Sequence, residues 1–165
     1  MKKLIFVRHA KAEESNGDFS DYYRSLTSRG KVTSRIMARK LNDLDDSPGL
    51  FITSPAFRAI ETALIFAGTF GLKPEKMVLD DNIYHKMNLD YLTSLLKEIG
   101  DDVDSVILFG HNPAFTQIPD ELSSDGCEMM PKCGIIGITF DIKVWKDLRR
   151  NTGKTIYYLK PEKIS

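Results

Sequence analysis

Apolar runs alternate with amphipathic segments along most of the chain. Residues 4–7 and 106–109 are continuous apolar runs with β-branched and aromatic members, which is typical of buried strands. Elsewhere, apolar residues recur every three or four positions with charged residues between them, which predicts amphipathic helices. Strands that alternate with helices predict an α/β protein. The predicted strands cover residues 4–7, 50–52, 77–79, 106–109, 134–140 and 155–159, and the predicted helices cover residues 28–44, 55–70, 89–99 and 113–122.

Proline, glycine and hydroxyl residues mark the expected helix ends. Ser54 and Pro55 predict the start of the second helix, with the hydroxyl as its N-cap and the proline at its first position. Gly71 is the expected end of the same helix. Pro119 lies inside the last predicted helix and is expected to kink or end it. Residues 80–85 have no clear periodicity, so we expect them to be irregular.

Length and charge exclude several classes of protein. The 165 residues are too few for two ordinary domains, so we expect one domain spanning residues 1–165. Basic and acidic residues number 23 each, which leaves no overall field to attract nucleic acid or an anionic membrane. The first apolar run is shorter than the ~7–15 residues of a signal sequence, so a cytoplasmic protein is expected. Cys127 and Cys133 lack CxxC spacing and are expected to be free thiols.

Polar residues that suit phosphate chemistry follow three of the predicted strands. Arg8 and His9 follow the first, Arg58 lies a few residues after the second, and His111 follows residues 106–109. The carboxyl ends of parallel strands form ligand sites in α/β proteins. Guanidinium groups and helix N-termini bind phosphate oxygens, and a neutral imidazole can attack phosphorus to give a phosphohistidine. The sequence therefore predicts a phosphate pocket.

These clusters resemble the signatures of a known family. Residues 6–10 (FVRHA), 54–62 (SPAFRAIET) and 110–113 (GHNP) resemble the three motifs of the histidine phosphatase superfamily, in the family's order. Residues 24–30 (RSLTSRG) and 130–135 (MPKCGI) resemble the small SixA-type phosphohistidine phosphatase branch. The likeness covers nearly the whole chain. It implies the phosphoglycerate-mutase-like fold, a three-layer α/β/α sandwich with a mostly parallel central sheet and no large lid insertions.

The resemblance also implies roles for individual residues. His9 would be the nucleophile of a metal-independent phosphatase that uses no cofactor. The substrate would be a phosphohistidine on a partner protein, such as a phosphotransfer domain or carrier. The side chains that would hold the phosphoryl group are Arg8, Arg58 and His111, with Arg24 as an additional contact and Asn112 and Ser54 as supporting residues.

One part of the family's machinery cannot be assigned from the sequence. Many superfamily members supply an acidic general acid from an insertion after the second motif, whereas the stretch between Gly71 and Leu89 is short here. A phosphoester needs such an acid, because it leaves as an alkoxide of high pKa. An imidazole, with an unperturbed pKa of roughly 6.5, leaves a P–N bond far more easily. The missing acid therefore favours a phosphohistidine substrate.

Two other functions remain open at this point. One is a broad phosphatase for small phosphoesters, with Asp80, Asp81 or Asp18 as the acid, and the other is a phosphate- or phosphopeptide-binding module without turnover. A metal hydrolase is disfavoured, since the arginines would repel a cation. His85 is expected to be a surface or packing residue. The loop acids Glu13, Glu14, Asp18 and Asp21 are expected to be solvated, although one of them could face the pocket.

Overall fold

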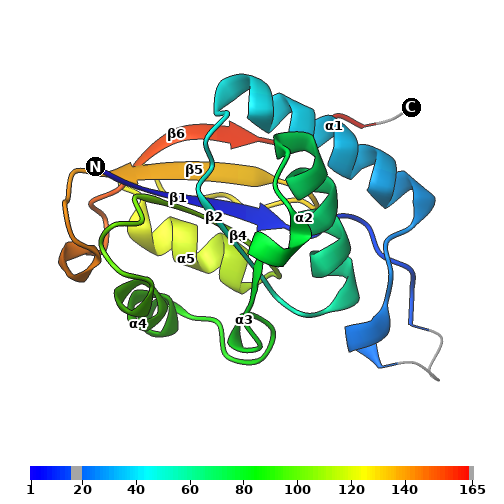
Figure 1. Ribbon diagram of the computed structural model, residues 1–165, viewed down its shortest axis with the longest axis horizontal. Helices are drawn as coiled ribbons and strands as arrows, with labels where there is room; N and C mark the ends of the chain where they lie inside the picture. Colours follow the sequence, from blue (N-terminus) through cyan, green and yellow to red (C-terminus); the bar gives the residue numbers. More distant parts are fainter. Residues whose placement is uncertain (16–19, 164–165) are drawn as a thin grey trace.

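A six-stranded sheet forms the centre of the molecule (Figure 1). The computed structural model describes residues 1–15 and 20–163. The strand order is β3-β2-β4-β1-β5-β6, in which the first four strands are parallel to one another and β5 is antiparallel to both of its neighbours, β1 and β6. This confirms the α/β class and the mostly parallel sheet. The strands are β1 (Lys2–Arg8), β2 (Leu50–Thr53), β3 (Val78–Leu79), β4 (Ser105–Gly110), β5 (Ile135–Phe140) and β6 (Lys154–Leu159).

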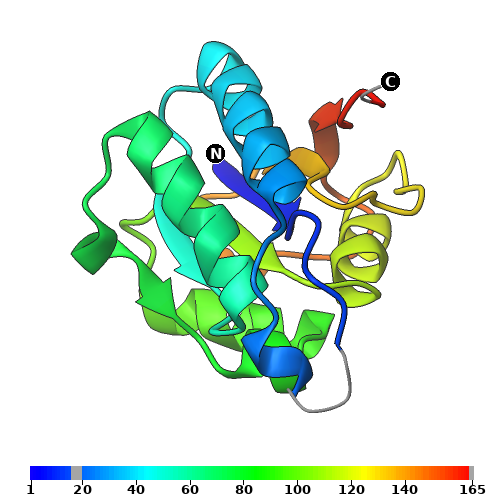
Figure 2. The ribbon, with the colours of Figure 1, turned by 90° about the vertical axis from the view of Figure 1, so that its right-hand side faces the viewer.

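Helices cover both faces of the sheet, which completes the three layers (Figures 1 and 2). Two long helices lie on one face and the remaining α-helices lie on the other. Within the described ranges, no helix combines the length and the apolar character that crossing a membrane requires. The α-helices are α1 (Ser28–Leu44), α2 (Phe57–Phe70), α3 (Asn82–His85), α4 (Leu89–Ile99) and α5 (Ala114–Leu122), and the 3-10 turns are η1 (Asp21–Tyr23), η2 (Pro74–Lys76) and η3 (Trp145–Asp147).

The apolar run in β1 is continuous because both faces of this strand are buried. Ile5 and Val7 pack into the core under α1 and α2, whereas Leu4 and Phe6 pack into the core on the opposite face. Alternate side chains of a strand point to opposite faces, so a central strand of a covered sheet needs apolar residues at every position. The strand β1 lies between β4 and β5, as this pattern requires.

Three local predictions about the helices were wrong. The helix α2 begins at Phe57 after Ala56, rather than at Pro55. The Ser54 hydroxyl does not cap it either, because the N-cap is Ala56 and no side chain caps this helix. Oγ of Ser54 accepts from the backbone N–H of Ala56 at 3.2 Å and pairs with His111, which follows β4. Pro119 lies inside α5 and does not end it, since the helix continues to Leu122, whereas the alternative of a kink stays a prediction. Residues 82–85, expected to be irregular, form the short helix α3.

Other local predictions are confirmed. Gly71 follows α2 with a φ of 70°, a left-handed conformation that glycine adopts without a Cβ clash. Cys127 and Cys133 are both free. The last two strands pair with each other as an antiparallel hairpin.

The register of the parallel strands brings the three motifs to one edge. Arg8 in β1 pairs with Gly110 in β4, and Thr53 in β2 pairs with Phe109 in β4. The residue that follows each strand therefore leaves the sheet at the same level. Backbone hydrogen bonds continue this alignment, from His9 N to Gly110 O at 3.0 Å and from Ser54 N to Phe109 O at 3.0 Å.

Candidate active site

His9 has one ring nitrogen fixed and the other facing an arginine. Its Nδ1 lies 2.7 Å from the carbonyl oxygen of Ala10, which can only accept a hydrogen bond. Nδ1 therefore carries the proton and Nε2 carries the lone pair in the neutral ring. The Nε of Arg58 donates to this Nε2 at 3.4 Å, a long hydrogen bond that leaves the lone pair available. Nε2 of His9 is thus the unprotonated ring nitrogen, and it faces the guanidinium of Arg58.

Both histidines of the site are held neutral. Burial lowers the pKa of His9 to about 4; the hydrogen bond to Ala10 opposes this shift, and the charges of Arg58 and Arg8 add to it. Burial lowers the pKa of His111 to about 3, with further lowering by His9 and Arg58. The two rings lie 5.2 Å apart between centroids. Two neutral imidazoles can lie this close together, whereas two positively charged imidazoles would repel each other.

Arg58 projects from the first turn of α2 and is almost fully buried. Beyond its contact with His9, its guanidinium donates from Nη1 to the carbonyl oxygen of Asp21 and from Nη2 to the carboxylate of Asp21, both at 2.7 Å. Cζ of the Arg58 guanidinium lies 6.0 Å from the centroid of the Tyr84 ring. Arg58 therefore connects His9 to Asp21 and lies beside Tyr84.

His111 and Ser54 meet across the ends of β4 and β2. Nε2 of His111 and Oγ of Ser54 are 2.8 Å apart. Nδ1 of His111 is buried and, within residues 1–15 and 20–163, has no hydrogen-bond partner. The edge of the Tyr84 ring lies against His111, with 5.4 Å between centroids. The contact with Ser54 thus orients the His111 ring.

Arg8 and Asn112 share one backbone acceptor. Nη1 of Arg8 and Nδ2 of Asn112 donate to the carbonyl oxygen of Met130 at 2.9 and 3.0 Å. Nε of Arg8 is buried, and no partner for it occurs in the described part of the chain. A buried N–H without a partner is costly, so a donor left in this state at a candidate site suits an anionic ligand. Asn112 supports the segment around Met130 rather than reaching His9 directly.

Arg24 joins the site through Asp21, one of the loop acids that were expected to be solvated. Nε of Arg24 donates to Oδ1 of Asp21 at 2.9 Å, and Nη1 donates to the carbonyl oxygen of Glu13 at 3.1 Å. Gly30 permits this arrangement, since a Cβ at that position would lie 2.2 Å from the carbonyl oxygen of Lys11. A larger residue would therefore push the loop that carries Arg24 away from the start of α1.

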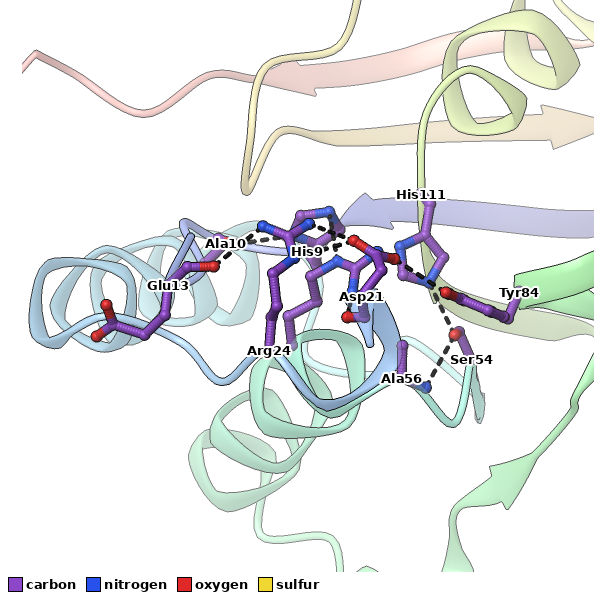
Figure 3. A network of polar contacts seen from close by, with 10 residues as sticks. His9, Ala10, Glu13, Asp21, Arg24, Ser54, Ala56, Tyr84 and His111 are labelled. Carbon is purple, nitrogen blue, oxygen red and sulfur yellow. Dashed lines mark hydrogen bonds and ion pairs between the residues drawn. The ribbon is translucent and has the colours of Figure 1, made fainter. Parts of the chain in front are cut away.

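Asp21, one of the four loop acids of which one could face the pocket, lies in the site, and Tyr84 joins it as a residue that sequence reasoning missed (Figure 3). The hydroxyl of Tyr84 donates to Oδ2 of Asp21 at 2.9 Å. Partial burial raises the pKa of Asp21, but hydrogen bonds from Arg58 and Tyr84 outweigh burial and lower the pKa to about 2. Burial and the hydrogen bond to Asp21 raise the pKa of Tyr84. The only sequence signal for Asp21 was its position three residues before Arg24, and Tyr84 had none.

Two further residues of the second motif tie the site together. Oε1 of Glu61 accepts from the backbone N–H of Leu26 at 3.1 Å, which fastens the Arg24 loop to α2. The hydroxyl of Thr62 accepts from the backbone N–H of Ala10 at 3.1 Å and donates to the carbonyl oxygen of Arg58 at 2.7 Å. Thr62 therefore fixes the end of β1 to the helix that carries Arg58.

The acids considered for ester hydrolysis have other contacts or lie outside the site network. Both oxygens of Asp80 accept from the hydroxyl of Tyr91, at 2.7 and 2.6 Å, and Oδ1 also accepts from Asn82 N. Asp81 is exposed at the start of α3. Asp18 lies outside the described residues. Within the described ranges, no group of three or more His, Cys, Asp or Glu side chains could hold a metal ion.

We expect neither site histidine to take up a proton between pH 8 and pH 5. Their pKa values of about 4 and about 3 lie below the unperturbed value of about 6.5. Because the unfolded chain binds these protons first, stability is full above pH ~6.5 and falls as the pH drops toward 4. Nitrogen-15 NMR titration of the imidazoles, assigned with His9→Asn and His111→Asn, measures this. Titration of His9 near pH 6.5 would contradict the buried, neutral ring.

Three arginines against one carboxylate leave excess positive charge around a neutral imidazole. Such a site can bind an oxyanion and attack its central atom with His9. The three motifs follow three different parallel strands, so their side chains reach this site from the ends of those strands.

Comparison with known proteins identifies the fold. No protein-family model matches the sequence, and no curated protein matches it either. Among solved structures, the protein histidine phosphatase SixA in complex with tungstate is similar at 22% identity and a TM-score of 0.78, over 96% of this chain and 97% of that one. An inferred SixA of Agrobacterium tumefaciens has the same identity and TM-score, over 97% and 99%. A mycobacterial glucosyl-3-phosphoglycerate phosphatase is 13% identical, with a TM-score of 0.68 over 94% and 97%. The chain therefore has the phosphoglycerate-mutase-like fold of these phosphatases.

Proposed function

We propose that the protein is a phosphatase of the histidine phosphatase superfamily that hydrolyses phosphohistidine on a partner protein. The observation that carries this proposal is the unprotonated Nε2 of His9, which faces Arg58 while Nδ1 is fixed on Ala10. The motifs around His9, Arg58 and His111 support the same reading, as does the fold shared with SixA. The complex of that relative with tungstate, a tetrahedral oxyanion, is consistent with a phosphoryl site.

The reaction takes two steps at His9. In the first, the Nε2 lone pair attacks phosphorus, a P–N bond forms to His9, and the bond to the leaving group breaks. In the second, water attacks the phosphorus of phospho-His9, inorganic phosphate departs, and the His9 lone pair is restored. Arg8, Arg24 and Arg58 stabilise the charge on the phosphoryl oxygens in both transition states. His111, neutral and oriented by Ser54, provides a further polar contact to the same group.

The acid-base properties of the site favour imidazole as the leaving group. Asp21, the carboxylate next to Arg58, has a pKa of about 2 and is ionised at neutral pH, so it cannot donate a proton there. Asp80 is occupied by Tyr91 and Asn82. Within residues 1–15 and 20–163, no acid of the site network is therefore placed to protonate an alkoxide leaving group, and such general acid catalysis contributes roughly 10²- to 10⁴-fold in rate. A substrate imidazole leaves readily without this help: with a proton on its other ring nitrogen it departs as neutral imidazole, whose conjugate acid has a pKa near 6.5.

The test is release of inorganic phosphate from three substrates under the same conditions, with EDTA present. They are a phosphohistidine carrier protein, an aryl phosphate and a sugar phosphate. We expect kcat/KM for the carrier to exceed that for the sugar phosphate by about a hundredfold or more, because the ester lacks a proton donor. EDTA should not reduce the rate, because the proposed mechanism uses no metal.

Each other outcome points to one of the alternatives. Preference for the esters would indicate that an acid is present and would favour the broad phosphatase. Activity that EDTA removes and a divalent metal restores would contradict the metal-free mechanism. No release from any substrate, with phosphate still bound, would favour the binding module.

A further inference from the structure

The carboxylate of Asp21 takes up the donors that a phosphoryl group needs. Arg58 Nη2 donates to Oδ2 at 2.7 Å, the hydroxyl of Tyr84 donates to the same oxygen at 2.9 Å, and Arg24 contacts Oδ1 through Nε at 2.9 Å and Nη2 at 2.8 Å. Carboxylate and phosphate oxygens are alternative acceptors for the same guanidinium groups. A phosphoryl group that enters the site must therefore compete with Asp21.

Asp21 makes these contacts next to the nucleophile. The Arg58 guanidinium that holds Oδ2 is the one whose Nε donates to His9 Nε2. In Figure 3 the carboxylate lies between the guanidinium of Arg24 and the hydroxyl of Tyr84, with His9 and His111 on either side of it in the view. A tetrahedral oxyanion held by Arg58 in front of His9 would occupy the space that the Asp21 carboxylate fills.

The carboxylate reaches this position from the exposed side of the site. Asp21 is the first residue of the turn η1, and 48% of its side chain is exposed, whereas the Arg58 side chain is 6% exposed. Arg58 is thus fixed by its surroundings, and Asp21 is the partner that can be displaced. Ion pairs with an exposed partner have modest free energies, so displacement by a dianion is feasible.

We propose that Asp21 is a specificity-determining residue, a tethered carboxylate that competes with phosphoryl groups for Arg58 and Arg24. A tethered group acts at a high effective concentration, so it raises the apparent dissociation constant of every small phosphate. A phosphoryl group presented by a protein adds contacts outside the pocket and can overcome this competition. The link to a protein substrate rests on the proposed function, whereas the competition itself does not.

The test is equilibrium binding of inorganic phosphate by calorimetry to the full chain and to Asp21→Asn. We expect Asp21→Asn to bind phosphate roughly tenfold more tightly, as it would if the carboxylate occupies the site about 90% of the time. Glu14→Gln is the matched control, since it removes one charge from an exposed position in the preceding loop, and it should leave the affinity unchanged. Asp21→Ala provides a second variant that removes the carboxylate, and thermal melting checks that both are folded.

Kinetics distinguish a competitor from a residue that positions the arginines. With an aryl phosphate, Asp21→Asn should lower KM and change kcat little. The ratio of kcat/KM for the carrier protein to kcat/KM for the aryl phosphate should therefore decrease. Weaker or unchanged phosphate binding in both Asp21 variants would overturn the proposal. If the Asp21 variants bind phosphate more tightly but the unaltered protein hydrolyses none of the three substrates, the competition by Asp21 is supported and the proposed function is refuted.

Discussion

His9→Ala is expected to abolish phosphate release, with a loss of about 10⁴-fold or more in kcat, as removal of a covalent nucleophile commonly causes. No other described imidazole combines a protonated Nδ1 on a backbone carbonyl with an Nε2 that faces Arg58. Binding of inorganic phosphate should persist, because Arg8, Arg24 and Arg58 remain in place. Steady-state assays with the carrier protein and calorimetry with phosphate measure the two quantities separately.

His85→Ala is the matched control for this result. His85 is exposed, and its ring contacts Tyr84 rather than the nucleophile, with 4.8 Å between ring centroids. We expect this variant to retain its activity. In the unaltered protein, rapid quench with labelled substrate should trap label on this protein itself. That label should be stable in base and released by acid, which is the behaviour of a phosphohistidine. Full activity in His9→Ala would rule out the covalent mechanism.

Arg58→Ala is expected to reduce both turnover and anion binding. We expect kcat to fall by about 10²- to 10³-fold, because Arg58 is the buried donor that would stabilise charge on the transferring group. Phosphate affinity should fall as well, since the same guanidinium contacts the ligand before reaction. Arg58→Lys should recover little, because an ammonium group cannot contact His9 and an oxyanion through one planar fork. The same assays and calorimetry apply.

Arg35→Ala is the control for the loss of one positive charge. Arg35 lies on α1 with its side chain exposed, and we expect normal turnover and normal phosphate affinity in this variant. A loss confined to KM in Arg58→Ala, with kcat unchanged, would mean that Arg58 binds the ground state and transition state equally and would contradict its proposed role.

The parts of the site that follow strands could be predicted from the sequence. A buried strand has a strong apolar pattern, and the residues that follow it must emerge at the edge of the sheet. This is why His9, His111 and Ser54 come together as expected, with backbone hydrogen bonds at the same level of the sheet. Arg58 follows from the same argument, because the first turn of a helix stays near the strand that precedes it.

The residues that come from loops could not be predicted in the same way. Asp21 looked like one of several solvated acids, of which one could face the pocket, because the sequence between β1 and α1 has no periodic pattern that singles out one of them. That path depends on distant contacts, such as the hydrogen bond from Leu26 N to Glu61. Tyr84 reaches Asp21 from the short helix α3, which has no periodic signal. The predicted Ser54 cap failed because α2 begins later, at Phe57 after Ala56, and the Ser54 hydroxyl pairs with His111 across the strand ends.

The central position of β1 has a consequence for how the protein folds. This strand pairs with β4 on one side and β5 on the other, so Arg8 must meet Gly110 and Val7 must meet Ile135. Contacts between such distant parts of a chain slow folding, because a long loop must close before they form. During synthesis, β1 leaves the ribosome before β4 and β5, the two strands that pair with it. His9 and His111 therefore come together only after β4 has been made.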